Sequence, residues 1–296
     1  MILDLPDTST RKIAAALLDA RENYSLATGR VLTLLVAVRA HDSVTEILNT
    51  VREATRSNPA RVLVLVLGDA GAATRIDAQL IVGADAGASE IVVMQLHGEL
   101  TAHQDAVVTP LLLPDTPVVA WWPTFDPPHP AQDQLGALSA RRITSYDTVA
   151  AAAAGYQPGD SDMMWSRITR WRGVVASALD RCPGAQVACV DISGRGGNPS
   201  VDIAAAWLAS ALGVPVTRHV AEEATERSPI ASVTMHSDAG DISVETLDAR
   251  TVAVTVPGRP ATFVALSPRT DAECLAEELR HLGPDATYGR ALEGVN

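Results

Sequence analysis

The stretches VLTLLVAV at residues 31–38 and VLVLVL at residues 62–67 decide the fold class of this chain. Both are nearly continuous apolar runs, without the alternation of apolar and polar side chains that marks a strand with one face in water. Between them, residues 43–56 have the apolar spacing of an amphipathic helix. A buried strand, a helix and a second buried strand predict a parallel pair inside a sheet that helices cover on both faces.

The same pattern continues on both sides of these runs. Residues 75–83 and 89–98 predict two further strands that could pair as a hairpin, and PVVAWW at 117–122 predicts a third central strand. Helices are predicted at 9–24 and 99–113. The first half of the chain therefore predicts a mostly parallel sheet.

The segment PTFDPPHPAQD at 123–133 interrupts this order with four prolines. Proline fixes φ and lacks a backbone N–H, so the segment predicts an irregular, exposed loop. A helix near 133–140 and a strand at 142–146 follow it.

The second half of the chain has a similar order of elements, which leaves open a duplication. Its predicted elements are a strand at 186–192, a helix at 200–212, a strand at 214–220, three or four β-type runs between 229 and 266, and a helix at 270–282. We therefore predict two α/β units, with mixed, mostly parallel sheets covered by helices, at 1–157 and 158–296.

Four of the five tryptophans lie in two segments, PLLLPDTPVVAWWP at 110–123 and DSDMMWSRITRWRGVVASALD at 160–180. The second segment predicts one long helix over 161–180, with Asp160 or Ser161 as its N-cap. Helical spacing predicts a buried face of Met164, Ile168, Trp171, Val175 and Ala178.

The flanks of this predicted face carry Trp165 and Arg172 on one side and Arg167 on the other. Two interpretations stay open for these residues. Tryptophans are usually buried, so they can be core residues, with the arginines bound to carboxylates or helix ends. Tryptophan and arginine are also the residues enriched in interface hot spots, which favours a partner surface.

The strongest enzyme-like signal is VACVDISGRGGNPSVDIAAAWLAS, in which a strand, a glycine-rich turn and a helix follow one another. The backbone N–H groups of Gly194, Gly196, Gly197 and Ser200 could bind an anion at such a helix start. Pro199 stands where a dinucleotide fingerprint has its third glycine, so the alternative is an ordinary tight turn.

Composition excludes several other classes. The chain has 23 basic and 35 acidic residues, a net charge of −12 that disfavours nucleic acid and anionic membranes as partners. Lys12 is the only lysine, which excludes a P-loop or Schiff-base lysine elsewhere. The seven histidines and three cysteines show no metal-ligand spacing, so neither a metal nor a cofactor is expected.

The compartment is predicted from three further features. Cys182, Cys189 and Cys274 are an odd number without paired spacing, and we expect Cys182 and Cys189 to be reduced and unpaired. The N-terminus does not have the pattern of a signal peptide. The apolar runs are much shorter than a membrane span requires, so we expect a cytoplasmic protein.

Five motifs stand together in this chain: Trp165-x-Arg167-x-x-x-Trp171-Arg172, Trp121-Trp122-Pro123, Arg141-Arg142-Ile143, Asn58-Pro59-Ala60-Arg61 before VLVLVL, and AAAWLASALG at 204–213. With them, the chain resembles the OpcA family of glucose-6-phosphate dehydrogenase assembly proteins from about residue 25 to about residue 270. The combination is more specific than any one motif.

The resemblance implies a non-catalytic protein that binds glucose-6-phosphate dehydrogenase and favours its assembled, active form, which supports NADPH production in the oxidative pentose phosphate pathway. The alternative is an enzyme or a nucleotide- or phosphate-binding protein that uses the Gly194–Ser200 turn. Self-association stays open. The residues predicted to contact the partner are Trp121, Trp122, Arg141, Arg142, Trp165, Arg167 and Arg172.

Overall fold

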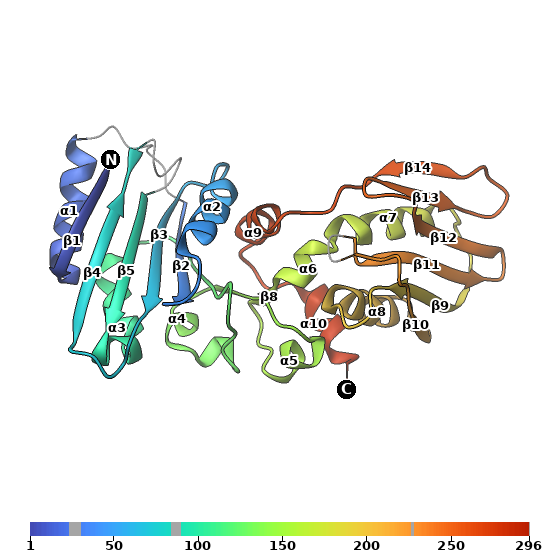
Figure 1. Ribbon diagram of the computed structural model, residues 1–296. Coiled ribbons are helices and arrows are strands. Elements are labelled where there is room, and N and C mark those ends of the chain that lie inside the picture. The colour runs from blue at the N-terminus through green and yellow to red at the C-terminus, as the bar shows by residue number, and fades with distance from the viewer. Residues whose placement is uncertain (24–30, 84–89, 226–227, 296) are drawn as a thin grey trace. The chain divides into compact units, whose positions relative to one another are not determined.

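The computed structural model describes residues 1–23, 31–83, 90–225 and 228–295 (Figure 1). The chain forms two compact units. Unit 1 comprises residues 1–145, 159–161 and 271–284, and unit 2 comprises residues 146–158, 162–270 and 285–296. The order of predicted elements that suggested domains at 1–157 and 158–296 does not anticipate this interleaving, and that division stays a prediction.

Unit 1 contains an eight-stranded sheet in the order β1-β4-β5-β3-β2-β6-β7-β8. Strands β5, β3, β2, β6 and β7 are parallel to one another, while β4 is antiparallel to β5 and to β1. The predicted hairpin and the three predicted central strands are confirmed. The bounds are β1 Ile2–Thr8, β2 Leu32–Arg39, β3 Ala60–Leu67, β4 Arg75–Ile81, β5 Glu90–His97, β6 Val118–Trp121, β7 Arg141–Thr144 and β8 Asp160–Asp162.

The apolar runs explain which strands are central. Both side-chain parities of β2 are buried, with Leu34, Leu35 and Val36 all fully inaccessible, so the strand is covered on both faces. The helices of unit 1 are α1 Thr10–Asn23, α2 Val44–Ala54, α3 Gln104–Val108, α4 Gln134–Ala137 and α9 Asp271–Arg280.

Three sequence predictions in unit 1 need correction or limits. The helix predicted at 99–113 is broken into η2 Gly98–Ala102, α3 and η3 Thr109–Leu111, and Pro110 lies in the first turn of η3, where its missing N–H costs least. The proline segment 123–133 is irregular apart from the short turn η4 Pro130–Gln132, but Pro127 and Pro130 are buried. Tyr24 and the predicted connection between residues 83 and 89 lie outside the described residues.

Unit 2 contains a six-stranded sheet in the order β10-β9-β11-β12-β13-β14. Unlike the predicted mostly parallel arrangement, β9 and β10 are its one parallel pair, and the other neighbours among the described strands are antiparallel. The strand orders of the two sheets differ. The bounds are β9 Val187–Gly194, β10 Val216–Val220, β11 Ile230–Ser237, β12 Gly240–Thr246, β13 Thr251–Thr255 and β14 Thr262–Ala265.

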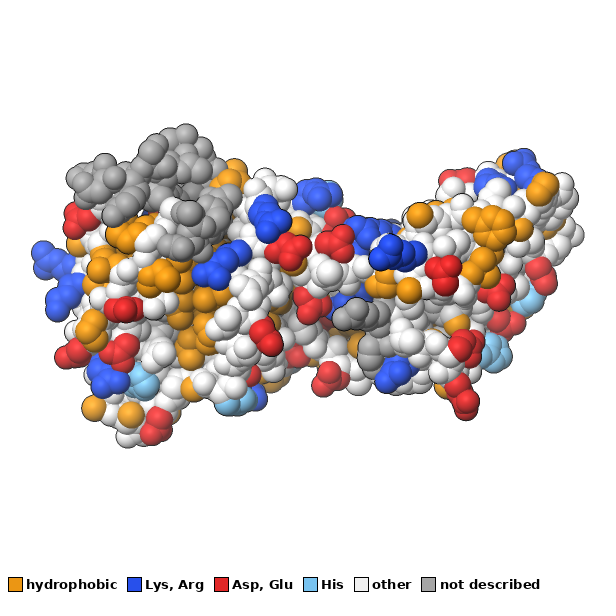
Figure 2. All heavy atoms as spheres, turned by 45° about the horizontal axis from the view of Figure 1, so that its top comes forward, with side chains coloured by type: hydrophobic (Ala, Val, Ile, Leu, Met, Phe, Trp, Pro, Cys, Tyr) orange, Lys and Arg blue, Asp and Glu red, His pale blue; other side chains and the backbone are white. Residues whose placement is uncertain are grey.

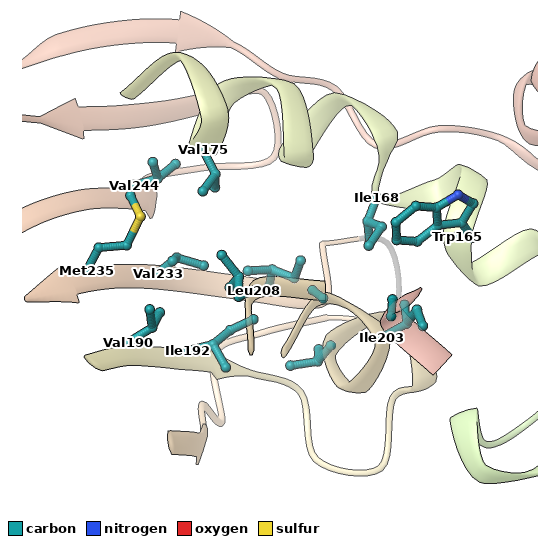
Figure 3. Packing of buried hydrophobic residues seen from close by; sticks show 14 of the residues in the cluster. Trp165, Ile168, Val175, Val190, Ile192, Ile203, Leu208, Val233, Met235 and Val244 are labelled. Carbon is teal, nitrogen blue, oxygen red and sulfur yellow. The ribbon is translucent and has the colours of Figure 1, made fainter. Parts of the chain in front are cut away.

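Helices cover one face of this second sheet. Figure 3 shows Ile192 and Val233 from the strands gathered with Val175 of α7 and Leu208 of α8, all in one cluster. Residues of the opposite parity on the same strands are half-buried or exposed. The helices of unit 2 are α5 Val149–Ala154, α6 Met163–Arg167, α7 Thr169–Asp180, α8 Pro199–Leu212 and α10 Ala286–Glu293.

The long helix predicted at 161–180 is wrong in two respects. Residues 160–162 form β8, and the helical part breaks at Ile168 into α6 and α7. The N-cap is Asp162, whose carboxylate accepts the N–H of Met164 at 2.9 Å. Asp160 is instead paired with Arg142 in unit 1, which holds this part of the chain extended.

The surface of the chain mixes both signs of charge. On the face drawn in Figure 2, acidic and basic side chains are interspersed. Among the described residues, none of the helices has the length and apolarity that crossing a membrane needs. Cys182, Cys189 and Cys274 form no disulfide bond.

Candidate functional sites

The first candidate site lies at the carboxyl ends of β2 and β6. The chain runs from β2 outward to β3 and β5, and then returns to the other side of β2 to form β6 and β7. In doubly wound sheets, ligands bind where the strand order reverses in this way. The fold thus places a potential ligand crevice between the turn after β2 and the turn after β6.

Side chains join the two turns across this crevice. The carboxylate of Asp42 accepts the N–H of Arg39 at 2.7 Å and the hydroxyl of Thr124 at 2.5 Å. The guanidinium of Arg39 lies over the ring of Phe125, 5.0 Å from its centroid. These contacts fasten the turns to each other in the place where a dinucleotide would lie.

The turn after β2 also has the wrong composition for a phosphate cradle. Its sequence is Arg39-Ala-His-Asp-Ser43, without glycine, so side chains keep a phosphate away from the backbone. Glu46 lies in the first turn of α2, where its negative charge opposes an anion. The crevice has the position of a dinucleotide site but not the residues for one.

The second candidate site is the glycine-rich turn before α8. A Cβ on Gly194 would lie 2.5 Å from the carbonyl oxygen of Pro229, so close chain packing explains that glycine. Gly197 has a φ of 68°, which favours glycine. Asn198 is the N-cap and accepts the N–H of Ser200 at 3.0 Å.

The start of α8 also carries its own ion pair. Asp202, in the first turn, is paired with Arg218, and Arg218 donates a second hydrogen bond to the carbonyl of Arg195. Burial raises the pKa of Asp202, against the opposing effect of Arg218. Intramolecular contacts therefore account for the turn, and anion binding by Gly194, Gly196, Gly197 and Ser200 stays a prediction.

The third candidate site is built from the tryptophan-arginine motif of α6 and α7. Trp165 is a core residue, 2% exposed, and its ring lies 5.4 Å from that of Tyr288. Its indole N–H donates to the carboxylate of Asp285 at 2.7 Å. The guanidinium of Arg172 lies 3.4 Å from the ring centroid, a cation–π contact.

Asp285 connects this stack to the last helix. Its carboxylate accepts the N–H groups of Thr287 and Tyr288 at 2.8 and 3.1 Å as the N-cap of α10. Burial alone would raise the pKa of Asp285, but the hydrogen bonds from Trp165 and from the two backbone N–H groups outweigh it and lower the pKa below its usual value. Trp165 and Arg172 thus stabilise unit 2.

The other half of the motif lines a groove. Arg167, Arg170 and Trp171 face it from α6 and α7, and Arg269 faces it from the segment after β14. The apolar part of the lining is Ile168, Trp171, Pro229, Ile230, Val252, Leu266 and Pro268. We call this pocket the Trp171 groove.

Backbone contacts fix the arginines around the Trp171 groove. Arg170 donates to the carbonyl of Ser267 at 3.1 Å, and Arg269 donates to the carbonyl of Ser166 at 2.9 Å. Arg167 donates to the carbonyl of Arg269 at 3.4 Å. The lining contains three guanidinium groups and one carboxylate, that of Asp248. It is therefore basic, although the chain as a whole is acidic.

The four predicted contact residues of unit 1 lie inside the fold. Trp122 is 1% exposed in the core, and Trp121 has a buried indole N–H without a hydrogen-bond partner among the described residues. Arg141 is bound to Glu278 and Arg142 to Asp160, with both guanidinium groups buried. Their predicted contact with a partner stays a prediction.

The structure thus separates the seven predicted contact residues. Only Arg167 and Arg172 are even partly exposed, and only Arg167 lines the Trp171 groove. Trp171, Arg170 and Arg269 line the groove but were missed. The spacing of four residues between Arg167 and Trp171 was the signal in the sequence that could have placed both on one surface. The prediction of a single straight helix instead placed Trp171 in the core and Trp165 on a flank. In the structure the helix breaks at Ile168, and Trp165 is the core residue.

The fold and these sites define a class: an α/β protein of two units whose first sheet is doubly wound, with its ligand crevice bridged by side chains. Within this class, the chain belongs to the OpcA family of glucose-6-phosphate dehydrogenase subunits. The model of the subunit's N-terminal domain matches residues 51–156, and the model of its C-terminal domain matches residues 158–292. No curated protein sequence matches the chain.

Several solved structures are similar to the whole chain. Glucose-6-phosphate 1-dehydrogenase from Mycobacterium avium is 8% identical with a TM-score of 0.49, and the match covers 89% of this chain and 90% of that one. Biliverdin reductase from Synechocystis is 11% identical with a TM-score of 0.46, covering 90% and 96%. A 3-ketoreductase from Actinomadura kijaniata is 11% identical with a TM-score of 0.47, covering 89% and 95%.

Proposed function

We propose that this chain is a non-catalytic subunit that binds glucose-6-phosphate dehydrogenase and favours the assembled, active form of that enzyme, thereby supporting NADPH production in the oxidative pentose phosphate pathway. The observation that carries the proposal is the family match over 51–156 and 158–292. The bridged crevice in unit 1 supports the non-catalytic part, because Asp42 and Thr124 occupy the position of a dinucleotide. We place this activity in the cytoplasm, and three cysteines without a disulfide bond fit a reducing compartment.

Activation of this kind has a simple physical requirement. A binding protein raises the population of the active form only if it binds that form more tightly than the inactive one. A tenfold shift needs about 1.4 kcal/mol of differential affinity. A few well-placed side chains are enough to supply this amount.

We propose the Trp171 groove as the main contact with the dehydrogenase. It combines a half-exposed tryptophan and three arginines, the residue types that dominate interface energetics. Its apolar lining and basic rim are complementary to an apolar side chain flanked by carboxylates. We therefore keep Arg167 among the residues proposed to contact the dehydrogenase, and we add Trp171, Arg170 and Arg269.

Trp171→Ala and Arg167→Ala are expected to raise the concentration needed for half-maximal activation by about tenfold or more. The truncations remove an anchor and a charge from the groove. The measurement is the activity of purified dehydrogenase titrated with each variant. Arg56→Ala is the matched control, because Arg56 is an exposed arginine of unit 1.

Thermal unfolding of each variant separates binding from folding. A variant that activates poorly but unfolds close to the parent temperature supports the groove. If both variants activate like the parent, the contact lies elsewhere, and a dehydrogenase activity of the isolated chain would contradict the non-catalytic role.

A further inference from the structure

The six-stranded sheet of unit 2 has a face that no helix among the described residues covers. Successive side chains along its strands point alternately to the core cluster and to this open face. Most side chains on the open face are small, and the surface is therefore flat. They include Ser193, Ser232, Thr234, Ser243, Ala253 and Thr255.

Four titratable residues form an oblique row across this open face. In order along the row they are His219 on β10, Asp191 on β9, His236 on β11 and Asp241 on β12. Nε2 of His219 lies 3.0 Å from Oδ1 of Asp191, and Nε2 of His236 lies 2.9 Å from Oδ2 of Asp191. Nδ1 of His236 lies 2.9 Å from Oδ1 of Asp241. Bases and acids therefore alternate along the row.

The geometry at His236 requires a positive charge. An ionised carboxylate only accepts hydrogen bonds, so a ring whose two nitrogens both contact carboxylates must donate from both. That state is the imidazolium. Hydrogen bonds to Asp191 and then to Asp241 raise the pKa of His236, in agreement with this assignment.

We propose that this open face binds the same face of a second copy of the chain, forming a symmetric dimer. The alternating row is self-complementary. A two-fold axis that runs parallel to the sheets, midway between the two facing copies, reverses the row in the second copy if it is perpendicular to the row and passes over the gap between Asp191 and His236. His219 then faces Asp241 of the second copy, and Asp191 faces its His236, so every acid lies over a base.

The area of the open face is large enough for an interface with a second copy of the chain. Six strands about 4.8 Å apart, each with four to eight residues of about 3.3 Å, span roughly 600 Å² per copy, or about 1,200 Å² in a pair. A specific interface needs about 1,000 Å². Sheets pack face to face about 10 Å apart, a distance that serine, threonine and alanine side chains can fill. Phe263 on the edge strand β14 is 67% exposed and adds an apolar contact.

Dimerisation of the isolated chain is expected to weaken as the pH rises. His236 is charged below its raised pKa and loses its charge as the pH rises through that value, above the ordinary value of about 6.5. The other titratable groups on this face are Cys189, paired in register with His236, and Glu245 on β12. The measurement is sedimentation equilibrium without dehydrogenase from about pH 6 to about pH 8.

His236→Gln is expected to raise the dimer dissociation constant by about tenfold at about pH 6, and to remove most of its pH dependence. His41→Gln is the matched control, because His41 is an exposed histidine of unit 1. Thr234→Tyr, in the middle of the face, is expected to prevent dimerisation by keeping the sheets apart. An aromatic residue is tolerated on an exposed strand, so the unfolding temperature should stay close to that of the parent.

Each outcome decides the proposal. A parent chain that stays monomeric at about 100 µM overturns it, as does a dimer that both variants leave intact. If Thr234→Tyr instead abolishes dehydrogenase binding by a monomeric parent, the face belongs to the dehydrogenase and not to a second copy. Because the sedimentation experiment omits the dehydrogenase, its result on dimerisation is independent of the proposed function.

Discussion

Trp165→Ala is expected to lower the free energy of unfolding by about 3–5 kcal/mol, the range for truncating a buried large aromatic residue. Trp165 is 2% exposed, and its ring contacts both Tyr288 and the guanidinium of Arg172. The truncation also removes the indole N–H from Asp285. A cavity would remain, and Oδ2 of the partly buried Asp285 would lose a hydrogen bond.

Chemical denaturation measures this loss, and Trp171→Ala is the matched comparison within the same motif. Trp171 is half-exposed at the Trp171 groove, so its truncation should cost only about 1–2 kcal/mol. Equal losses from the two variants would contradict the division of the motif into a core half and a groove half.

Arg141→Ala is expected to cost about 3–5 kcal/mol, because it leaves the buried carboxylate of Glu278 without its counter-ion. Nε of Arg141 lies 2.7 Å from this carboxylate, and its Nη1 lies 2.8 Å from the carbonyl of Gly283. Both side chains of the pair are almost completely inaccessible, at 3% and 2%. Bulk water therefore does not solvate this carboxylate in the parent chain.

A double-mutant cycle tests the Arg141–Glu278 pair directly. Arg141→Met alone and Glu278→Leu alone should each destabilise the chain strongly. The double variant should lose much less stability than the sum of the two single losses, since neither charge is left buried. Strictly additive losses in denaturant would show that the pair does not act as a unit.

The buried strands were predictable because their sequence is apolar on both side-chain parities. This pattern can be read from each segment by itself, without knowledge of which other segments it contacts. The strand β8 in place of the first helical turn was not predictable, because residues 160–162 are held partly by the pairing of Asp160 with Arg142. Helical spacing alone cannot detect a contact of this kind.

The candidate sites show the same limit. Arginine is usually found at the surface. Arg141 is buried because it pairs with Glu278, which comes 137 residues later in the sequence. The row from His219 to Asp241 depends on strand register, which places residues from four strands together. Arg167 was predictable because its motif is local.

The interleaving of the two units has a consequence for biosynthesis. Residues 271–284 return to unit 1, where α9 packs against α2, and α10 packs against α8 in unit 2. During translation, domains usually fold in the order in which they leave the ribosome. Here unit 1 lacks a helix until α9 has been synthesised, and unit 2 lacks one until α10 has been synthesised. Until these segments have been synthesised, Arg141 has no Glu278 and Trp165 has no Asp285, so each unit should complete its folding only after residues 271–293 have been added.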